Sequence, residues 1–242
     1  MTGLYKQSRD LGRMRRMPKK RIVRRTLRPV FYIFCEGEKT EPYYLEQYIL
    51  RHCSGFRSVQ INRIKWSDVV KIPKTNRTDP NSLVNLAIKQ KSKSPSPDQD
   101  QYWCVYDREA ENVVHKSIHI KAFNVAAENE IKVAFSNVCF EVWLLLHKQN
   151  GCAPYVSCDD LLKRSQLFRY FPGYKKGCRR EFDGRDIVNA RKQAVIMNAH
   201  TCNVTAKEMP DKIDPRRLVD LNPYTDFYKL LDAIDMFLAC LK

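Results

Sequence analysis

The sequence lacks any apolar stretch long enough to cross a membrane. Its longest apolar runs, around Val30–Cys35 and Val142–Leu146, have the length of buried strands or helix faces, whereas a membrane-spanning helix needs roughly 20 apolar residues. The basic N-terminal segment is not followed by the apolar region of a secretory signal peptide, and the sequence contains no internal repeat. We therefore expect a cytoplasmic protein that makes no contact with a membrane.

The nine cysteines lack the regular spacing of a disulfide framework. Several of them, such as Cys35 and Cys104, lie in apolar, strand-like runs, where a free thiol behaves as a small hydrophobic side chain. A zinc site is an alternative for one group, His147, Cys152, Cys158 and Cys178, but its spacing does not match the usual structural zinc motifs. We therefore expect reduced thiols with mostly structural roles.

Acidic residues are too few to balance the basic ones, because 27 Asp and Glu oppose 43 Lys and Arg and leave a net charge of +16. Much of this excess lies in residues 1–28, where Asp10 is the only acid. Such a block is typical of an extended arm, which serves either as a solubilising tail or as a contact for nucleic-acid phosphates. Arginine suits bidentate phosphate binding, so we favour the second function. The side chains expected to make this contact are Arg15, Arg16, Lys19, Lys20, Arg21, Arg24 and Arg25.

Short apolar runs alternate with helical patterns, which indicates βαβ units and a parallel sheet in an α/β fold. Strands are expected at Val30–Cys35, Val59–Ile64, Tyr102–Tyr106 and Ile131–Phe135. Helices are expected at Thr40–His52, from the turn at Asp79–Ser82 to Lys91, from Glu109 to Lys121, and at Val138–Lys148, Asp183–Met197 and Tyr224–Leu241. We divide the chain into a basic arm (1–28), a catalytic core (29–150) and a helical, basic extension packed on the core (151–242).

Carboxylates follow the predicted strands at one edge of the sheet. Glu36 closes the first strand, and Asp107 and Glu109 close the strand at Tyr102–Tyr106. Ligands of open parallel sheets bind outside the carboxyl ends of the strands. Each acid could instead be a helix cap or an ion-pair partner, but their coincidence at one edge favours a shared site. Converging oxygen ligands suit Mg²⁺ or Mn²⁺, and such an ion on a basic protein suggests phosphate chemistry, with Glu36 as general acid or base.

Glu141 is the acid whose surroundings are most unusual. It is expected one turn into the helix Val138–Lys148, within an otherwise apolar segment. Burying a bare carboxylate costs several kcal/mol, so Glu141 must be paired, hydrogen-bonded, metal-bound or protonated. We assign it to the site, and we interpret His147 on the same apolar helix as structural.

A basic, aromatic stretch, Phe168–Arg180, follows the core. Its aromatic side chains could grip a single nucleic-acid strand by stacking, although packing within the C-terminal region is the favoured interpretation. Lys175 and Lys176 of this stretch, together with Lys39, complete the expected nucleic-acid contacts.

Three motifs closely resemble the RloB-like family. They are FCEGEKTEPYY (residues 34–44), WCVYDRE (103–109) and AFSNVCFEVWLLLH (134–147), and NPYTD (222–226) fits the family as well. The resemblance implies a Toprim-like (Rossmann-like) fold with a small parallel sheet, and a role in bacterial phage defence by abortive infection, often beside an ATPase partner. By position it makes Glu36 the general acid or base or a metal ligand and Asp107 the principal metal ligand, while Glu109 stands where a second aspartate is usual.

We therefore expect a Mg²⁺- or Mn²⁺-dependent nuclease that acts as the effector of a defence system, with DNA and RNA both open as substrates. The expected catalytic residues are Glu36, Asp107, Glu109 and Glu141, of which the first three also bind the metal. The alternative is a non-catalytic subunit that binds nucleic acid or a nucleotide and regulates an ATPase partner.

Overall fold

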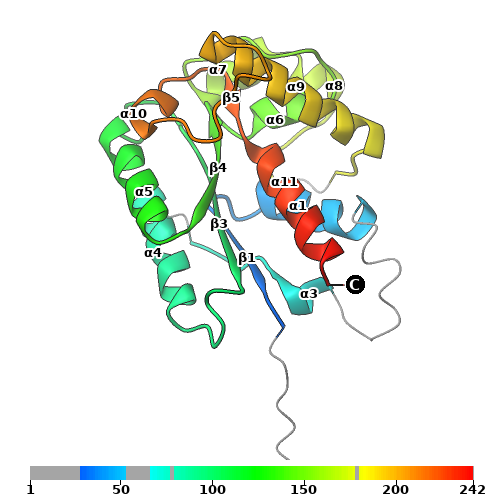
Figure 1. The fold of residues 1–242 in the computed structure, drawn as a ribbon. Coiled ribbons are helices and arrows are strands. Elements are labelled where there is room, and N and C mark those ends of the chain that lie inside the picture. Colours follow the sequence, from blue (N-terminus) through cyan, green and yellow to red (C-terminus); the bar gives the residue numbers. More distant parts are fainter. Residues whose placement is uncertain (1–27, 53–65, 77–78, 178–179, 242) are drawn as a thin grey trace, which may run out of the picture.

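A five-stranded sheet lies between two layers of helices in the computed structural model, which describes residues 28–52, 66–76, 79–177 and 180–241 (Figure 1). The strands are β1 (Phe31–Cys35), β2 (Val70–Lys71), β3 (Gln101–Asp107), β4 (Lys132–Asn137) and β5 (Tyr224–Thr225). Their order is β2-β1-β3-β4-β5, with β5 antiparallel to β4 and the other pairs parallel. The predicted α/β fold with a small parallel sheet flanked by helices is confirmed, and it is consistent with a Rossmann-like fold.

The two faces of the sheet bury different side chains because neighbouring strand residues point to opposite sides. On β3, Trp103 and Val105 pack in the larger core cluster, whereas Cys104 and Tyr106 pack in the smaller one. The larger core also takes side chains from α1 (Thr40–His52), α3 (Trp66–Val69), α6 (Glu141–Leu145), α7 (Cys158–Arg164), α8 (Leu167–Tyr170), α9 (Gly184–Cys202) and α11 (Phe227–Ala239). The smaller core is covered by α4 (Pro80–Lys91), α5 (Lys116–Glu128) and α10 (Pro215–Leu218).

Most of the predicted elements are present in the described residues. The strands expected at Val30–Cys35, Tyr102–Tyr106 and Ile131–Phe135 correspond to β1, β3 and β4. The expected helices starting at Thr40, after Asp79 and after Asp183 are α1, α4 and α9. Asp79 and Asp183 accept hydrogen bonds from backbone amides in the first turns of α4 and α9. The strand expected at Val59–Ile64 lies outside the described residues. The short edge strand β2 and the strand β5 were not predicted.

Three helix predictions were wrong at the start of the helix. The helix expected at Tyr224–Leu241 is α11, which begins only at Phe227, because Tyr224 and Thr225 pair with β4 as the strand β5. The helix expected directly after Glu109 begins only at Lys116, because Glu109 has a φ of 53° and a left-handed residue cannot continue a right-handed helix. The helix expected at Val138–Lys148 is the five-residue α6, and Asn137 is the last residue of β4 rather than a cap. The backbone carbonyl of Val138 accepts a hydrogen bond from the amide of Glu109 (3.0 Å), so this segment is tied to the β3 loop before α6 begins.

Segments beyond residue 150 contribute to the same sheet and core as β1 and α1. β5 adds the last strand, and Leu161, Leu167 and Phe227 belong to the larger core cluster. The division into arm, core and extension stays a prediction, and residues 1–27 of the arm lie outside the described residues. None of the described helices combines the length and the apolar character needed to cross a membrane.

The chain reverses its direction across the sheet between β1 and β3. Helix α1, which follows β1, lies on one face, whereas α4 and α5, which flank β3 in the chain, lie on the other face (Figure 1). From β1 the chain continues outward to β2, and from β3 it continues outward to β4, so the connections run in opposite directions along the sheet from this pair. In open α/β sheets, ligands bind at such a switch point, outside the carboxyl ends of the strands.

Phe227 lies on the face of α11 that packs into the larger core cluster. Its ring is fully buried and contacts the rings of Tyr44, Phe140 and Trp143 at centroid distances of 5.6, 5.0 and 5.5 Å. We expect Phe227→Ala to lower the free energy of unfolding by about 3–5 kcal/mol, as is typical for a buried phenylalanine. Met236→Ala on the same helix, where the side chain is 64% exposed, should change it by less than about 0.5 kcal/mol. Urea unfolding measures both, and equal losses would contradict this account of the core.

Candidate functional site

An acidic cleft of about 620 Å³ opens at the carboxyl ends of β1 and β3. All four carboxylates predicted to be catalytic line this cleft, so the structure brings the sequence-predicted group together, while the role of each member stays a prediction. The charged residues of the lining are Glu36, Glu38, Lys39, Glu41, Asp79, Asp107, Glu109, Glu141 and Lys176.

Backbone hydrogen bonds beyond the strand ends fix Glu36 and Asp107 relative to each other. The amide of Glu36 donates to the carbonyl of Val105 (2.9 Å), which continues the β1–β3 ladder. The Glu36 carboxylate in turn accepts a hydrogen bond from the amide of Asp107 through Oε2 (3.1 Å). The two acids are therefore held at adjacent strand ends by the pairing of the strands themselves.

In the segment Asp107–Glu109, the two acids line the cleft, whereas the arginine between them does not. Arg108 instead donates to the carbonyls of Val219 (3.1 Å) and Val114 (2.9 Å) and forms an ion pair with Glu111. Glu109 takes its uncommon left-handed backbone conformation at this point. As a result both acids line the cleft and the arginine does not neutralise them from within it.

Glu41 is a member of the cleft that the sequence analysis did not assign to the site. It lies in the first turn of α1, is 6% exposed, and faces Gly37 of the preceding turn. A Cβ atom at position 37 would overlap the Glu41 carboxylate, so glycine is the residue that leaves room for it. An acid in a first helical turn is common for dipole reasons alone, and this is why the sequence did not single out Glu41.

Burial and mutual repulsion raise the pKa values of these acids. Burial raises the pKa of Glu36 to about 7; the hydrogen bond from Asp107 opposes this shift, and the carboxylates of Glu109, Glu41 and Asp79 add to it. Burial, with a contribution from Glu141, also raises the pKa of Glu41 to about 7. The pKa of Asp107 lies well above its ordinary value for the same reasons, burial first and then Glu41 and Glu36. Acids also outnumber bases in the cleft, because its lining holds seven carboxylates and two lysines.

The chemistry of this donor set suits a hard divalent cation, but the carboxylate oxygens of Glu36, Asp107 and Glu109 do not all lie within 4.8 Å of one another, so a bound cation would have to draw them together. Glu36, Asp107 and Glu109 offer only carboxylate oxygens, which are the ligands that Mg²⁺ and Mn²⁺ prefer. A cation among them would also oppose the repulsion that holds their protons.

Glu141 lies at the first residue of α6, not one turn into the helix as predicted, and is 2% exposed. Both of its oxygens are hydrogen-bonded: Oε1 accepts from the hydroxyl of Tyr174 (2.8 Å) and Oε2 from the thiol of Cys158 (3.4 Å). Partial burial lowers the pKa of Lys176, but the nearby Glu141 carboxylate and Cys158 raise it by more, so its net shift is upward. Buried Glu141 is thus both hydrogen-bonded and close to an opposite charge, and Tyr174 and Cys158 are partners that sequence reasoning missed.

The residues predicted to bind nucleic acid fall into two groups. Lys39 and Lys176 line the cleft, and Lys175 is exposed beside it. The predicted contacts of the arm, from Arg15 to Arg25, lie outside the described residues.

The described part of the aromatic stretch Phe168–Arg180 is only partly packed. Phe171 and Tyr174 are buried, as the favoured packing interpretation expects, whereas Phe168 is 48% exposed. His147 is structural, since its ring nitrogens pair with the Tyr44 hydroxyl and the Trp143 carbonyl, both at 3.0 Å. Of the four residues in the zinc alternative, Cys178 lies outside the described residues, and His147, Cys152 and Cys158 do not form one metal-ligand cluster.

The fold and the cleft together define an α/β protein of Rossmann-like architecture with an acidic site at its sheet edge. A sequence model of the family described as RloB-like protein matches residues 31–234. The chain therefore belongs to the RloB-like family. Comparisons with curated proteins and with solved structures gave no significant match.

We expect Glu36→Gln to stabilise the folded protein by an amount that grows with pH. The folded-state pKa of Glu36, about 7, exceeds the ordinary value of 4.5, so the wild-type protein loses stability as the pH rises through this interval, whereas glutamine cannot ionise. The gain should be close to zero at acidic pH and should reach roughly 1–3 kcal/mol once Glu36 is ionised. Urea unfolding of both proteins across this range, with a chelator present, measures it.

Glu128→Gln is the matched control, because Glu128 is exposed on α5. It should change the free energy of unfolding by less than about 0.5 kcal/mol at any pH. A Glu36→Gln protein whose stability relative to wild type does not depend on pH would contradict the raised pKa.

Proposed function

We propose that this RloB-like protein is a metal-dependent nuclease that cleaves phosphodiester bonds in DNA or RNA. The observation that carries the proposal is that Glu36, Asp107 and Glu109, which follow two neighbouring parallel strands, line one cleft at the switch point of the sheet. Perturbed acids in a cleft are typical of functional sites. We further propose that the protein acts in the cytoplasm, beside an ATPase partner, as the effector of a bacterial phage-defence system by abortive infection.

Glu36, Asp107 and Glu109 would hold Mg²⁺ or Mn²⁺. Such an ion neutralises charge on a phosphate and lowers the pKa of bound water. Burial raises the pKa of Glu36 to about 7 in the absence of a cation, so Glu36 is suited to accept or release a proton near neutral pH if Asp107 and Glu109 hold the ion and Glu36 stays beside it. Lys39 and Lys176 lie on the same cleft, where their charges would bind and orient the phosphates of the substrate.

We expect Asp107→Asn to abolish metal-dependent cleavage while leaving nucleic-acid affinity unchanged or slightly higher. Loss of a metal ligand should remove several kcal/mol of transition-state stabilisation, which corresponds to at least about a 100-fold loss of rate. The measurement is cleavage of plasmid DNA and total RNA with Mg²⁺, Mn²⁺ or a chelator, together with a binding titration.

Asp98→Asn serves as the control, since Asp98 is exposed in the loop before β3, at the opposite end of that strand. Unchanged cleavage by Asp107→Asn would remove Asp107 from the mechanism. If the wild-type protein cleaves neither substrate, even with its ATPase partner, the non-catalytic binding subunit is the better account.

Deletion of residues 1–28 should weaken nucleic-acid binding and flatten its dependence on salt. Each phosphate contact that is lost lowers the slope of log affinity against log salt by about 0.9 for duplex DNA. Binding titrations over a series of salt concentrations measure this slope. As a control for net charge, Lys89→Gln with Lys93→Gln removes two exposed charges outside the cleft and should leave the slope nearly unchanged. An unaltered slope after the deletion would exclude the arm as a phosphate contact.

A further inference from the structure

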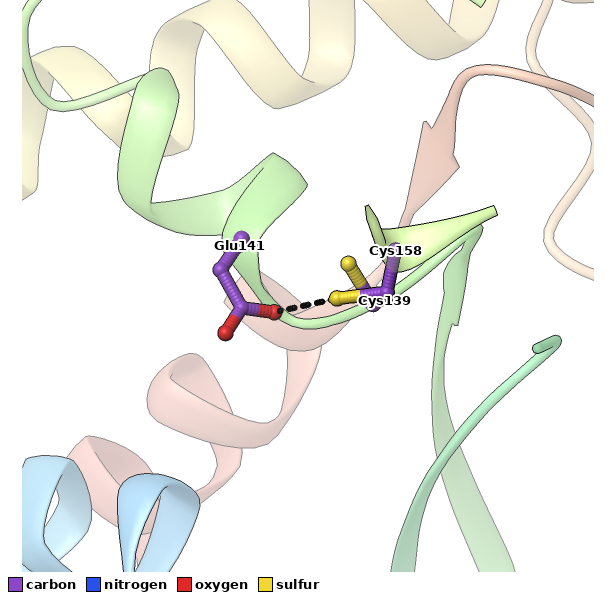
Figure 2. A group of neighbouring side chains, drawn as sticks. All are labelled: Cys139, Glu141 and Cys158. Carbon is purple, nitrogen blue, oxygen red and sulfur yellow. Dashed lines mark hydrogen bonds between the residues drawn. The ribbon is translucent and has the colours of Figure 1, made fainter. Parts of the chain in front are cut away.

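A second group of possible metal ligands lies beside the acidic cleft and differs from it in chemistry. Cys139, Glu141 and Cys158 each offer one ligand atom, and these three atoms lie within 4.8 Å of one another (Figure 2). Cys139 lies in the turn between β4 and α6, Glu141 begins α6, and Cys158 begins α7. All three side chains are buried, with exposures of 0, 2 and 6%, and neither cysteine is in a disulfide.

We infer that Cys139, Cys158 and Glu141 form a zinc site. Thiolate sulfur is a soft ligand that selects Zn²⁺ over Mg²⁺, in contrast to the all-oxygen set of Glu36, Asp107 and Glu109. In a tetrahedral site, zinc bonds of about 2.0–2.3 Å place two ligand atoms roughly 3.3–3.8 Å apart, and the Cys158 thiol and Glu141 Oε2 are already 3.4 Å apart. A small adjustment of the side chains therefore brings the three atoms to bonding distance.

The surroundings of Glu141 match those of a metal-bound carboxylate. Tyr174 donates its hydroxyl hydrogen bond to Oε1 (2.8 Å), while Oε2 is the oxygen that faces the thiol of Cys158 (3.4 Å). One oxygen is thus held from outside the cluster and the other is directed toward the thiol, as an outer-shell hydrogen bond does for a metal ligand.

The charges also balance. Zinc binding would release the two thiol protons to solvent, leaving two thiolates and one carboxylate with three negative charges around a doubly charged ion. The remaining negative charge lies near the ammonium group of Lys176, which already interacts with both Glu141 and Cys158. Three protein ligands leave the fourth tetrahedral position to a water molecule.

A metal at this place would join segments that are distant in the chain. It would tie the start of α7 to the β4–α6 turn, and through Tyr174 and Lys176 it would hold the following loop beside the cleft. The inference is separate from the metal site of the proposed nuclease, because it concerns different metal ligands and a different class of metal ion, although Glu141 also lines the acidic cleft.

The test is metal analysis and cobalt substitution of the full chain. Protein purified without chelator should contain one zinc ion per chain by mass spectrometry. After the zinc is removed, added Co²⁺ should produce the near-ultraviolet thiolate-to-cobalt charge-transfer band. Cys139→Ser and Cys158→Ser should each lose the zinc and most of this band, whereas Cys202→Ser, which replaces a buried cysteine of the other core, should keep both.

Circular dichroism of each variant separates loss of the metal from loss of the fold. Asp107→Asn should keep the cobalt band, since it alters only the oxygen site. A wild-type chain that contains no zinc and gives no thiolate band with Co²⁺ would overturn the inference. So would a band of full strength in the folded Cys139→Ser, Cys158→Ser double variant.

Discussion

The parallel pairing of β1 with β3 is the constraint on which the site depends. The register places Cys35 beside Val105, and the ladder continues past the strand ends through the amide of Glu36. Because β1 and β3 are parallel and end at the same edge of the sheet, the residues that follow the two strands lie near one another there. The hydrogen bond from the Asp107 amide to Glu36 (3.1 Å) is the direct consequence, and the cleft is built around it.

The same pairing forces like charges together in a poorly solvated place. The pKa values of Glu36 and Glu41 rise to about 7 and that of Asp107 rises as well, so the cluster opposes folding at neutral pH. The aromatic core around Tyr44, Trp143 and Phe227 lies under this edge and offsets the repulsion. Acids kept in such an unfavourable arrangement indicate a function that requires them.

Glu141 connects the acidic cleft to the thiols beside it. It lines the cleft, yet its hydrogen bonds go to Tyr174 and Cys158. Two donor chemistries therefore adjoin, one of carboxylate oxygens at the ends of β1 and β3 and one of thiols in the β4–α6 turn and at the start of α7. Lys176 lines the cleft and also interacts with Glu141 and Cys158, so its positive charge is close to both groups.

The order of apolar runs along the chain was enough to predict β1, β3, β4 and the helices that start at Thr40 and after Asp79. It also predicted that Glu36, Asp107 and Glu109 share one edge, because parallel strands must end on the same side. The left-handed turn at Glu109, the antiparallel β5 and the partners of Glu141 were decided only by tertiary structure. Glu41 shares the cleft because Gly37 leaves it room, and Cys158 and Tyr174 reach Glu141 across 17 and 33 residues of chain. Local periodicity reports which face of an element is apolar, whereas contacts of this kind depend on how distant segments pack.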